Sequence, residues 1–334
     1  MMTLLSFERE LATLYKELEE KTGLEKKELK NVIEERLKVI YKSLTPYNIV
    51  EVARHLDRPQ TLDYIKELLT NFVEIKGDRI SGEDRSIIAG IGKFNGLSLT
   101  VIGSNKGHTI IERLKSNSGM IGPSGFRKIA RAVDIASNTF KTPILTFIDT
   151  PGARVSPETE KEGSVAALSE PIKAFLKAKV PVLSVVIGEG GSLGALSLLV
   201  SDRILMLSYS YLSVISPEVG ASVLFKDRSM KKDIAKALKI TSEELLNFNV
   251  INGIIEEPFT GAHRNPELTI QTVKEALQKE FELLLKEPSE NLLKRRAEKF
   301  EKFKNKKFKM HLFLLFLLNF CKVSRLVFPI DCEY

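Results

Sequence analysis

The sequence has no tryptophan, two cysteines and four histidines among its 334 residues. Cys321 and Cys332 both lie in the last fourteen residues, so the sequence predicts neither a disulfide framework nor a CxxC metal knuckle. The histidines are scattered and form no HExxH pair, so we expect no bound metal. Such sparse use of thiols is typical of a reducing compartment, and a cytoplasmic protein is expected.

Signatures of nucleotide binding and of membrane insertion are also missing. There is no GxxxxGK[ST] phosphate loop, and Leu193 stands where a dinucleotide fingerprint beginning at Gly188 needs its third glycine. The first residues reach Glu8 and Glu10 without the basic stretch and long apolar run of a signal peptide. The apolar run 312–321 is shorter than the about 20 residues that a spanning helix needs, so no membrane span is expected.

The net charge of +7 is concentrated in one segment. Residues 294–309 hold nine basic and two acidic side chains and so account for the whole excess. The rest of the chain is close to neutral, and a nucleic-acid partner is not expected for the main domain. One alternative keeps the protein as a non-enzymatic binding module whose basic segment contacts nucleic acid or anionic lipid.

Four parts are expected along the chain. Residues 1–45 have the apolar spacing of two charged helices broken at Thr22-Gly23, which predicts a helical arm. Residues 46–288 form the main domain, followed by a basic helix at 289–310 and an atypical apolar tail at 311–334. Within the main domain, Asn95-Gly96 predicts a hairpin, and the strands and helices that alternate after it are typical of an α/β fold.

A weak internal repeat suggests where chemistry could occur. An apolar strand at 144–148 ends in a turn with Gly152-Ala153, and 38 residues later a similar strand ends in Gly188, Gly190 and Gly191. Each turn opens a helix, so backbone N–H groups of Gly190 and Gly191 beside Gly152-Ala153 would form an oxyanion hole. Close helix–strand packing without any ligand explains the same glycines equally well.

Ser192 permits a different enzyme class. The segment 190–194 matches G-x-S-x-G between a strand and a helix, and Asp202 or Asp227 followed by His263 would complete a hydrolase triad. As the first residue of a helix, Ser192 would instead cap backbone N–H groups with its hydroxyl. The serine hydrolase therefore stays as an alternative.

Several ordered segments between about 45 and 265 together resemble the alpha subunit of the acetyl-CoA carboxylase carboxyltransferase, a member of the crotonase superfamily. The matching segments are 53–65, 77–79, 101–103 with Lys106-Gly107, 148–153, 186–192, 213–218 and 261–264. The resemblance implies a crotonase-like ββα spiral. It also implies transfer of a carboxyl group from carboxybiotin to acetyl-CoA, giving malonyl-CoA in the first step of fatty acid biosynthesis.

The resemblance also implies partners and roles. Biotin is expected on a separate biotin carboxyl carrier protein, ATP is used by the partner biotin carboxylase, and a zinc-ribbon beta subunit holds the acyl-CoA in an α2β2 complex. The N–H groups of Gly190 and Gly191 would stabilise charge on the ureido oxygen of biotin. Gly152, Ala153, Gly188 and Ser192 would line the substrate site, which contains no metal.

The sequence departs from the family near this site. Segment 154–162 replaces a glycine-rich run, Leu193 replaces a glycine, and Val219-Gly220 replaces a glycine followed by a small residue. His108 and Thr109 stand where the family tends to have Arg-Asp. An inactive paralogue, or one with a different acyl-CoA preference, is therefore a further alternative.

Overall fold

The computed structural model of the chain describes residues 4–305. Contacts divide the chain into two units, Met1–Arg296 and Ala297–Tyr334. The described part of the second unit is the end of one helix, in which the ammonium group of Lys299 lies 5.8 Å from the ring centre of Phe300. The predicted apolar tail 311–334 falls outside the described residues, and the predicted boundaries at 45, 288 and 310 stay predictions.

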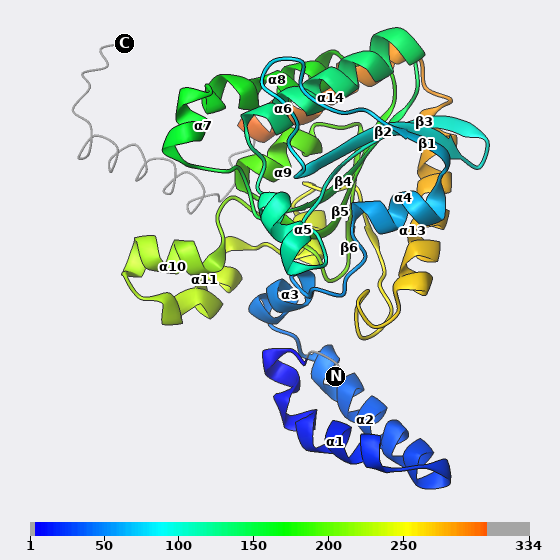
Figure 1. The fold of residues 1–334 in the computed structure, drawn as a ribbon, viewed down its shortest axis with the longest axis vertical. Helices are drawn as coiled ribbons and strands as arrows, with labels where there is room; N and C mark the ends of the chain where they lie inside the picture. The colour runs from blue at the N-terminus through cyan, green and yellow to red at the C-terminus, as the bar shows by residue number, and fades with distance from the viewer. Residues whose placement is uncertain (1–3, 306–334) are drawn as a thin grey trace. The chain divides into compact units, whose positions relative to one another are not determined.

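A mixed β-sheet forms the centre of the first unit (Figure 1). Its strands are β1 Thr70–Glu74, β2 Ile87–Phe94, β3 Leu97–Ser104, β4 Ile144–Thr150, β5 Val182–Gly191, β6 Arg203–Leu207, β7 Tyr211–Ser213 and β8 Gly253–Ile255. The order is β1-β2-β3-β4-β5-β6-β8, and β7 pairs with β5. The pairs β1–β2 and β2–β3 are antiparallel and all the others are parallel, which confirms the expected α/β class.

Two local predictions are confirmed by the strand pairing. Phe94 pairs with Leu97 across Asn95-Gly96, and both turn residues have positive φ angles of 47° and 85°, as a tight hairpin turn requires. The internal repeat appears as adjacent parallel strands, since Ile144 pairs with Val182 and the same offset of 38 residues continues to Ile148. The repeat therefore reflects two neighbouring units of one sheet.

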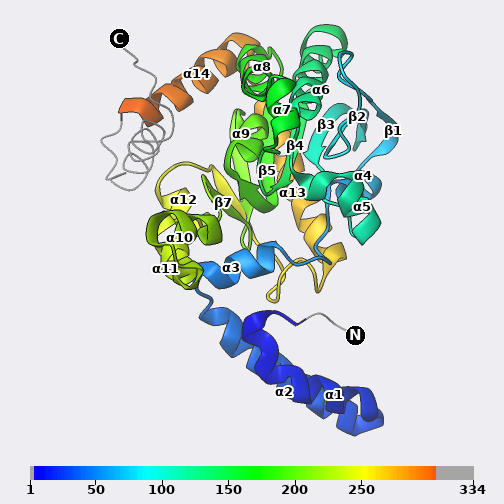
Figure 2. The same cartoon turned by 60° about the vertical axis from the view of Figure 1, so that its left-hand side comes forward.

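Helices surround the sheet and precede it. The described helical segments are η1 Ser6–Leu11, α1 Ala12–Glu20, α2 Gly23–Lys42, α3 Pro46–Ala53, α4 Thr61–Leu68, α5 Ile110–Lys115, η2 Asn117–Gly119, α6 Pro123–Asp134, η3 Ile135–Phe140, α7 Pro157–Lys161, α8 Ser164–Lys177, α9 Ser192–Leu199, α10 Pro217–Phe225, η4 Arg228–Met230, α11 Lys231–Leu238, α12 Ser242–Asn247, α13 Pro266–Leu284 and α14 Ser289–Asn305. The predicted break at Thr22-Gly23 is confirmed, and Thr241 forms a capping box with Glu244 at the start of α12. Figure 2 shows α3 beside α10 and α11.

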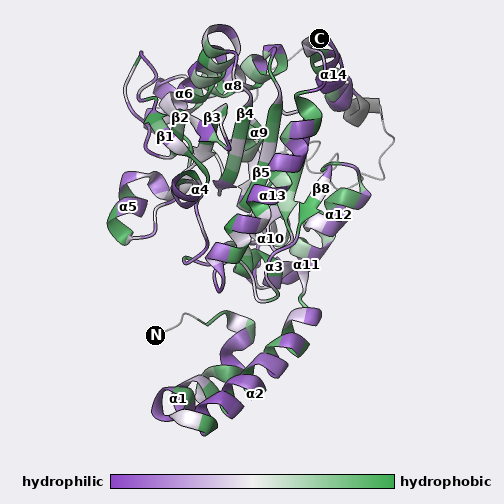
Figure 3. Ribbon diagram, turned by 90° about the vertical axis from the view of Figure 1, so that its right-hand side faces the viewer, coloured by the Kyte–Doolittle hydropathy of each residue, from purple (hydrophilic) through white to green (hydrophobic). Residues whose placement is uncertain are grey.

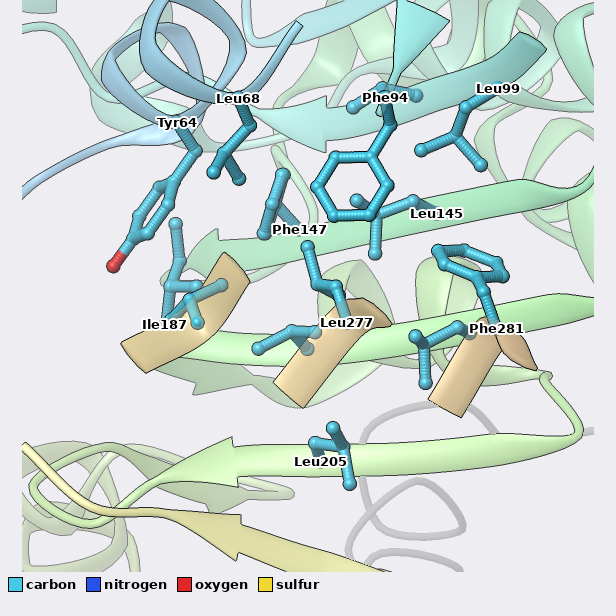
Figure 4. Close-up of a cluster of buried hydrophobic side chains, with 14 of the residues drawn as sticks. Tyr64, Leu68, Phe94, Leu99, Leu145, Phe147, Ile187, Leu205, Leu277 and Phe281 are labelled. Atoms are coloured by element: carbon cyan, nitrogen blue, oxygen red, sulfur yellow. The ribbon is translucent and has the colours of Figure 1, made fainter. Parts of the chain in front are cut away.

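The largest apolar core lies between the sheet and helices α4 and α13. Figure 4 shows Leu145, Phe147 and Leu205 of the strands directed toward Leu277 and Phe281 of α13. Strands β4 and β5 are buried along their whole length, and Figure 3 shows them as hydrophobic ribbons. Fully buried parallel strands need cover on both faces, which the flanking helices supply.

The helical arm packs through its own apolar seam. Leu11, Ile33 and Leu37 are buried together with Tyr41. A buried ion pair joins this arm to the loop before α13, since Arg264 Nη2 lies 2.7 Å from Glu8 Oε1. The hydroxyl of Tyr41 donates to the same oxygen at 2.8 Å.

Arg296 lies in the basic helix but is not one of its solvent-exposed charges. Its guanidinium is fully buried and forms an ion pair with Asp202 at 2.7 Å. It also donates to the backbone oxygens of Phe175 in the last turn of α8 and of Ala178 and Val180 after it. This arginine therefore belongs to the core of the first unit, because it pairs with a buried carboxylate and with backbone carbonyls at the end of α8.

Candidate active site at two glycine turns

The two glycine turns lie side by side at the carboxyl ends of neighbouring strands. Strands β4 and β5 are parallel, and Thr150 pairs with Gly190 after an irregularity that follows Ile148. The backbone oxygen of Gly191 lies 3.7 Å from the position that a Cβ on Gly152 would take. The predicted juxtaposition of Gly152-Ala153 with Gly190 and Gly191 is therefore present.

The glycines are required for different physical reasons. Gly152 has a φ angle of 145°, but a Cβ there would meet no atom closer than 3.7 Å. A Cβ on Gly191 would lie 2.1 Å from the backbone oxygen of Pro151, and one on Gly190 would lie 2.9 Å from that of Tyr211. A Cβ at position 152 would therefore make ordinary van der Waals contacts with Gly191 and Ser192, whereas a Cβ at position 190 or 191 would clash with neighbouring backbone.

Strand β5 continues further than the sequence suggests. It extends through Gly191, and Gly190 pairs with Leu212 of β7 as well as with Thr150. Helix α9 then begins at Ser192, with Gly191 as its N-cap. The first amides of α9 have no partner within the helix, so the start of α9 presents backbone donors.

The predicted capping role of Ser192 is wrong. No side-chain cap hydrogen bond is present at α9, and Ser192 itself has a φ angle of 48°. A residue in this left-handed region cannot serve as a helix N-cap, which requires extended backbone geometry. A non-glycine residue held at positive φ stores strain, which is often found at functional sites.

The structure does not assemble the hydrolase triad. Both oxygens of Asp202 accept from Arg296, and Asp227 caps the short helix η4 through the N–H of Ser229. His263 is stacked on His55 with ring centres 4.1 Å apart, and neither of its ring nitrogens has a hydrogen-bond partner. Burial, together with the nearby cations, lowers the pKa of His263 to about 2. Neither aspartate nor His263 therefore forms the hydrogen bonds that a triad with Ser192 requires.

Replacing Ser192 by alanine tests this conclusion. We expect a change in the free energy of unfolding within about 0.5 kcal/mol, because no hydrogen bond of the hydroxyl is lost and alanine suffers the same backbone strain. Carboxyltransferase activity of the assembled complex should persist. A thousandfold loss of activity in a variant with an unchanged urea denaturation curve would instead favour the serine hydrolase.

A buried ionic cluster lies directly behind the turn that contains Gly190. The carboxylate of Glu189 accepts hydrogen bonds from Arg54 Nε at 2.8 Å, from Lys106 Nζ at 2.9 Å and from the hydroxyl of Tyr211. Arg54 follows α3 and also pairs with Glu218 of α10 at 2.8 Å. The cluster thus connects β5 with the end of α3, which precedes it in the sequence, and with α10, which follows it.

This cluster keeps Glu189 ionised. Burial favours a neutral carboxyl and would raise its pKa, but Lys106 and Arg54 outweigh burial and lower the pKa to about 2. Burial and the adjacent Glu189 carboxylate raise the pKa of the Tyr211 hydroxyl well above its usual value. Neither group therefore exchanges a proton near neutral pH, and their role is electrostatic and structural.

The sequence did not predict this cluster. Glu189 and Arg54 are 135 residues apart, and Glu218 and Arg54 are 164 apart. One signal was present, because each repeated turn carries one acidic residue, Asp149 or Glu189, at its strand end. Carboxylates at the ends of adjacent parallel strands lie at the same edge of a sheet and need cations there.

Most of the departures from the family pattern lie at exposed or half-exposed positions, with Thr159 and Gly220 buried. Leu193 is half exposed at the start of α9, and Val219 is half exposed in α10. Segment 154–162 contains α7, whose N-cap Ser156 forms a capping box with Thr159. His108 Nε2 lies 2.8 Å from Asp63 Oδ2, so His108 is part of a surface ion pair. None of the four replaces a member of the ionic cluster.

Within residues 4–305, no group of His, Cys, Asp and Glu side chains could hold a metal ion. Over the same residues, no helix is long and apolar enough to cross a membrane.

Comparison with known proteins gives the family. Residues 3–304 match the family model described as acetyl co-enzyme A carboxylase carboxyltransferase-like. The acetyl-coenzyme A carboxylase carboxyl transferase subunit alpha of Carboxydothermus hydrogenoformans is 43% identical over 89% of this chain and 93% of its own. The subunit of the same name from Treponema denticola is 43% identical over 85% of this chain and 93% of its own.

Solved structures support the fold. The transcarboxylase 12S hexamer core matches with a TM-score of 0.58 and 16% identity, covering 72% of this chain and 44% of that chain. The beta subunit of P. aeruginosa geranyl-CoA carboxylase matches with a TM-score of 0.55 and 18% identity, covering 74% and 45%. The predicted crotonase-like fold is thereby confirmed, and the chain belongs to the family of acetyl-CoA carboxylase carboxyltransferase alpha subunits.

Proposed function

We propose that this chain supplies the biotin half of a carboxyltransferase site that moves a carboxyl group from carboxybiotin to acetyl-CoA and yields malonyl-CoA. The observation that carries the proposal is the junction of β5 and α9 beside Gly152, where a Cβ on Gly152 would clash with no atom and the first amides of the helix have no helical partner. A flat, polar ureido ring needs donors on a surface without side chains. Backbone N–H groups at a strand–helix junction meet that need.

Each site residue has a defined part in this proposal. The N–H groups of Gly190 and Gly191, with the first amides of α9, stabilise negative charge that develops on the ureido oxygen. Gly152 and Ala153 form the opposite wall. Gly188 leaves room for the Asp149 carboxylate, which occupies the space that a side chain at position 188 would need. Ser192 borders the proposed biotin site, with its Cβ 3.7 Å from the position of a Cβ on Gly152.

Carboxybiotin supplies the carboxyl group and is carried on a separate biotin carboxyl carrier protein in this proposal. A partner biotin carboxylase consumes the ATP, and a zinc-ribbon beta subunit holds acetyl-CoA, in an α2β2 complex located in the cytoplasm. Exposed apolar side chains around the turns support a protein partner there, since such groups mark interaction surfaces. They are Leu193, Leu196, Val214, Val219 and Val223.

Dependence on a partner is the direct test. The purified chain alone should form little malonyl-CoA from carboxybiotin and acetyl-CoA, because half of the site is missing. Adding a beta subunit should restore the rate and shift the elution volume of the chain on gel filtration. Full activity of the single chain would contradict the shared site, and a formed but inactive complex would contradict the proposed reaction.

A further inference from the structure

Lys106 occupies a buried position that the proposed reaction does not use. It lies two residues after β3, and only 8% of its surface is exposed. Its backbone is held on both sides, since Ser116 Oγ donates to its carbonyl at 2.7 Å and the N–H of Gly107 donates to Gln60 Oε1 at 2.8 Å. The backbone from which the Lys106 side chain extends is therefore fixed in position.

The ammonium group of Lys106 joins the two glycine turns. Its Nζ lies 2.7 Å from Asp149 Oδ1 at the end of β4 and 2.9 Å from Glu189 Oε2 near the end of β5. The same Asp149 oxygen accepts the backbone N–H of Glu189 at 2.8 Å. One cation thus fixes the spacing between the turn that leads to Gly152 and the turn that leads to Gly190.

Lys106 cannot act on substrate itself. Burial alone would lower its pKa, but Asp149 and Glu189 outweigh burial and raise the pKa, so Lys106 is no proton acceptor at neutral pH. Its stem is covered as well, because a Cβ on Gly119 would lie 2.8 Å from its Cγ. Any influence on the reaction must pass through the two turns.

We propose that Lys106 is a positioning residue that aligns the backbone donors of the Gly190–Gly191 turn with the wall formed by Gly152. This proposal rests on the function proposed above. Oxyanion-hole donors act only when they are aimed at the developing charge, so a small shift of one turn against the other loses their effect. The neighbouring Arg54 holds the second oxygen of Glu189 and cannot replace Lys106, because it makes no contact with Asp149.

The test compares two variants in the assembled carboxyltransferase complex. Lys106→Met keeps the stem and removes the charge, leaving Asp149 and Glu189 with one cation fewer, so reduced stability is expected. Lys106→Met combined with Glu189→Gln removes one charge of each sign and should recover most of that stability. We expect both variants to lose about a hundredfold in kcat, the effect of one misaligned donor, with the KM for acetyl-CoA within about twofold of the original.

The charge-balanced double variant decides between positioning and stability. A kcat close to that of the unchanged complex in this variant would overturn the proposal, since only folding would then depend on Lys106. Hydrogen exchange at amides 190–194 gives a second readout that needs no activity. We expect faster exchange in the folded double variant, and unchanged exchange would also overturn the proposal. An unchanged complex that forms no malonyl-CoA would instead refute the proposed function.

Discussion

Gly191→Ala should disrupt the fold around the site and abolish activity. Its Cβ would lie 2.1 Å from the backbone oxygen of Pro151, so the β4 and β5 turns must separate. Overpacking a rigid site costs about 1–3 kcal/mol and more when backbone must move, so a loss of at least about 3 kcal/mol is expected. Chemical denaturation would measure this loss, and gel filtration would show whether the complex still forms.

Gly152→Ala is the matched variant. Its Cβ would lie 3.7 Å from the nearest atoms, an ordinary van der Waals contact, and would intrude on the proposed ureido site. The substitution should therefore cost only the strain of an unusual φ angle, about 1–3 kcal/mol, while it strongly reduces carboxyl transfer. If the folded Gly152→Ala complex keeps its rate of carboxyl transfer, biotin does not bind beside Gly152. If Gly191→Ala is as stable as the unchanged chain, close packing does not explain that glycine.

Arg296→Met should cost about 3–5 kcal/mol of unfolding free energy, because it leaves Asp202 as a buried charge without its partner. It also removes the guanidinium hydrogen bonds to the carbonyls of Phe175, Ala178 and Val180, of which Phe175 keeps the backbone N–H of Ala178. Thermal and urea denaturation measure the effect. Combining it with Asp202→Asn should recover part of the loss, since the uncompensated charge is then removed.

The adjacent Arg295 offers a control. Its guanidinium pairs with Glu287 at 2.7 Å, but both side chains are exposed to water. Exposed pairs contribute about 0–1 kcal/mol, so Arg295→Met should change stability little. Equal effects of the two substitutions would show that the helix matters only through its net charge. Deletions meant to test the basic segment should accordingly start after Arg296.

What could be predicted from the sequence depended on local or periodic information. The hairpin at Asn95-Gly96 is specified by two residues, and the pairing of β4 with β5 by a repeat of 38 residues. The fold and the family could be predicted because many short segments occur in the family's order. A single glycine turn would not have been enough. The short strands β1, β7 and β8 escaped notice because three to five residues show little periodicity.

The missed features involve distant partners or backbone detail. The cluster of Lys106, Asp149 and Glu189 joins residues up to 83 positions apart, and nothing local marks a buried lysine. Arg296 was grouped with eight other basic residues, although its partner Asp202 lies 94 positions away. The positive φ of Ser192 is a backbone detail at the junction of β5 and α9 that sequence preference alone does not reveal.

The late position of Arg296 bears on how the chain acquires its structure during synthesis. Its guanidinium donates hydrogen bonds to carbonyls between residues 175 and 180. Leu292 joins an apolar core that consists mainly of strands synthesised much earlier. A ribosome must therefore have produced nearly all of the first unit before that core is sealed. Until then Asp202 faces water without its partner. We expect nascent chains halted before residue 292 to remain sensitive to protease, and those extended beyond residue 296 to become resistant once they leave the exit tunnel.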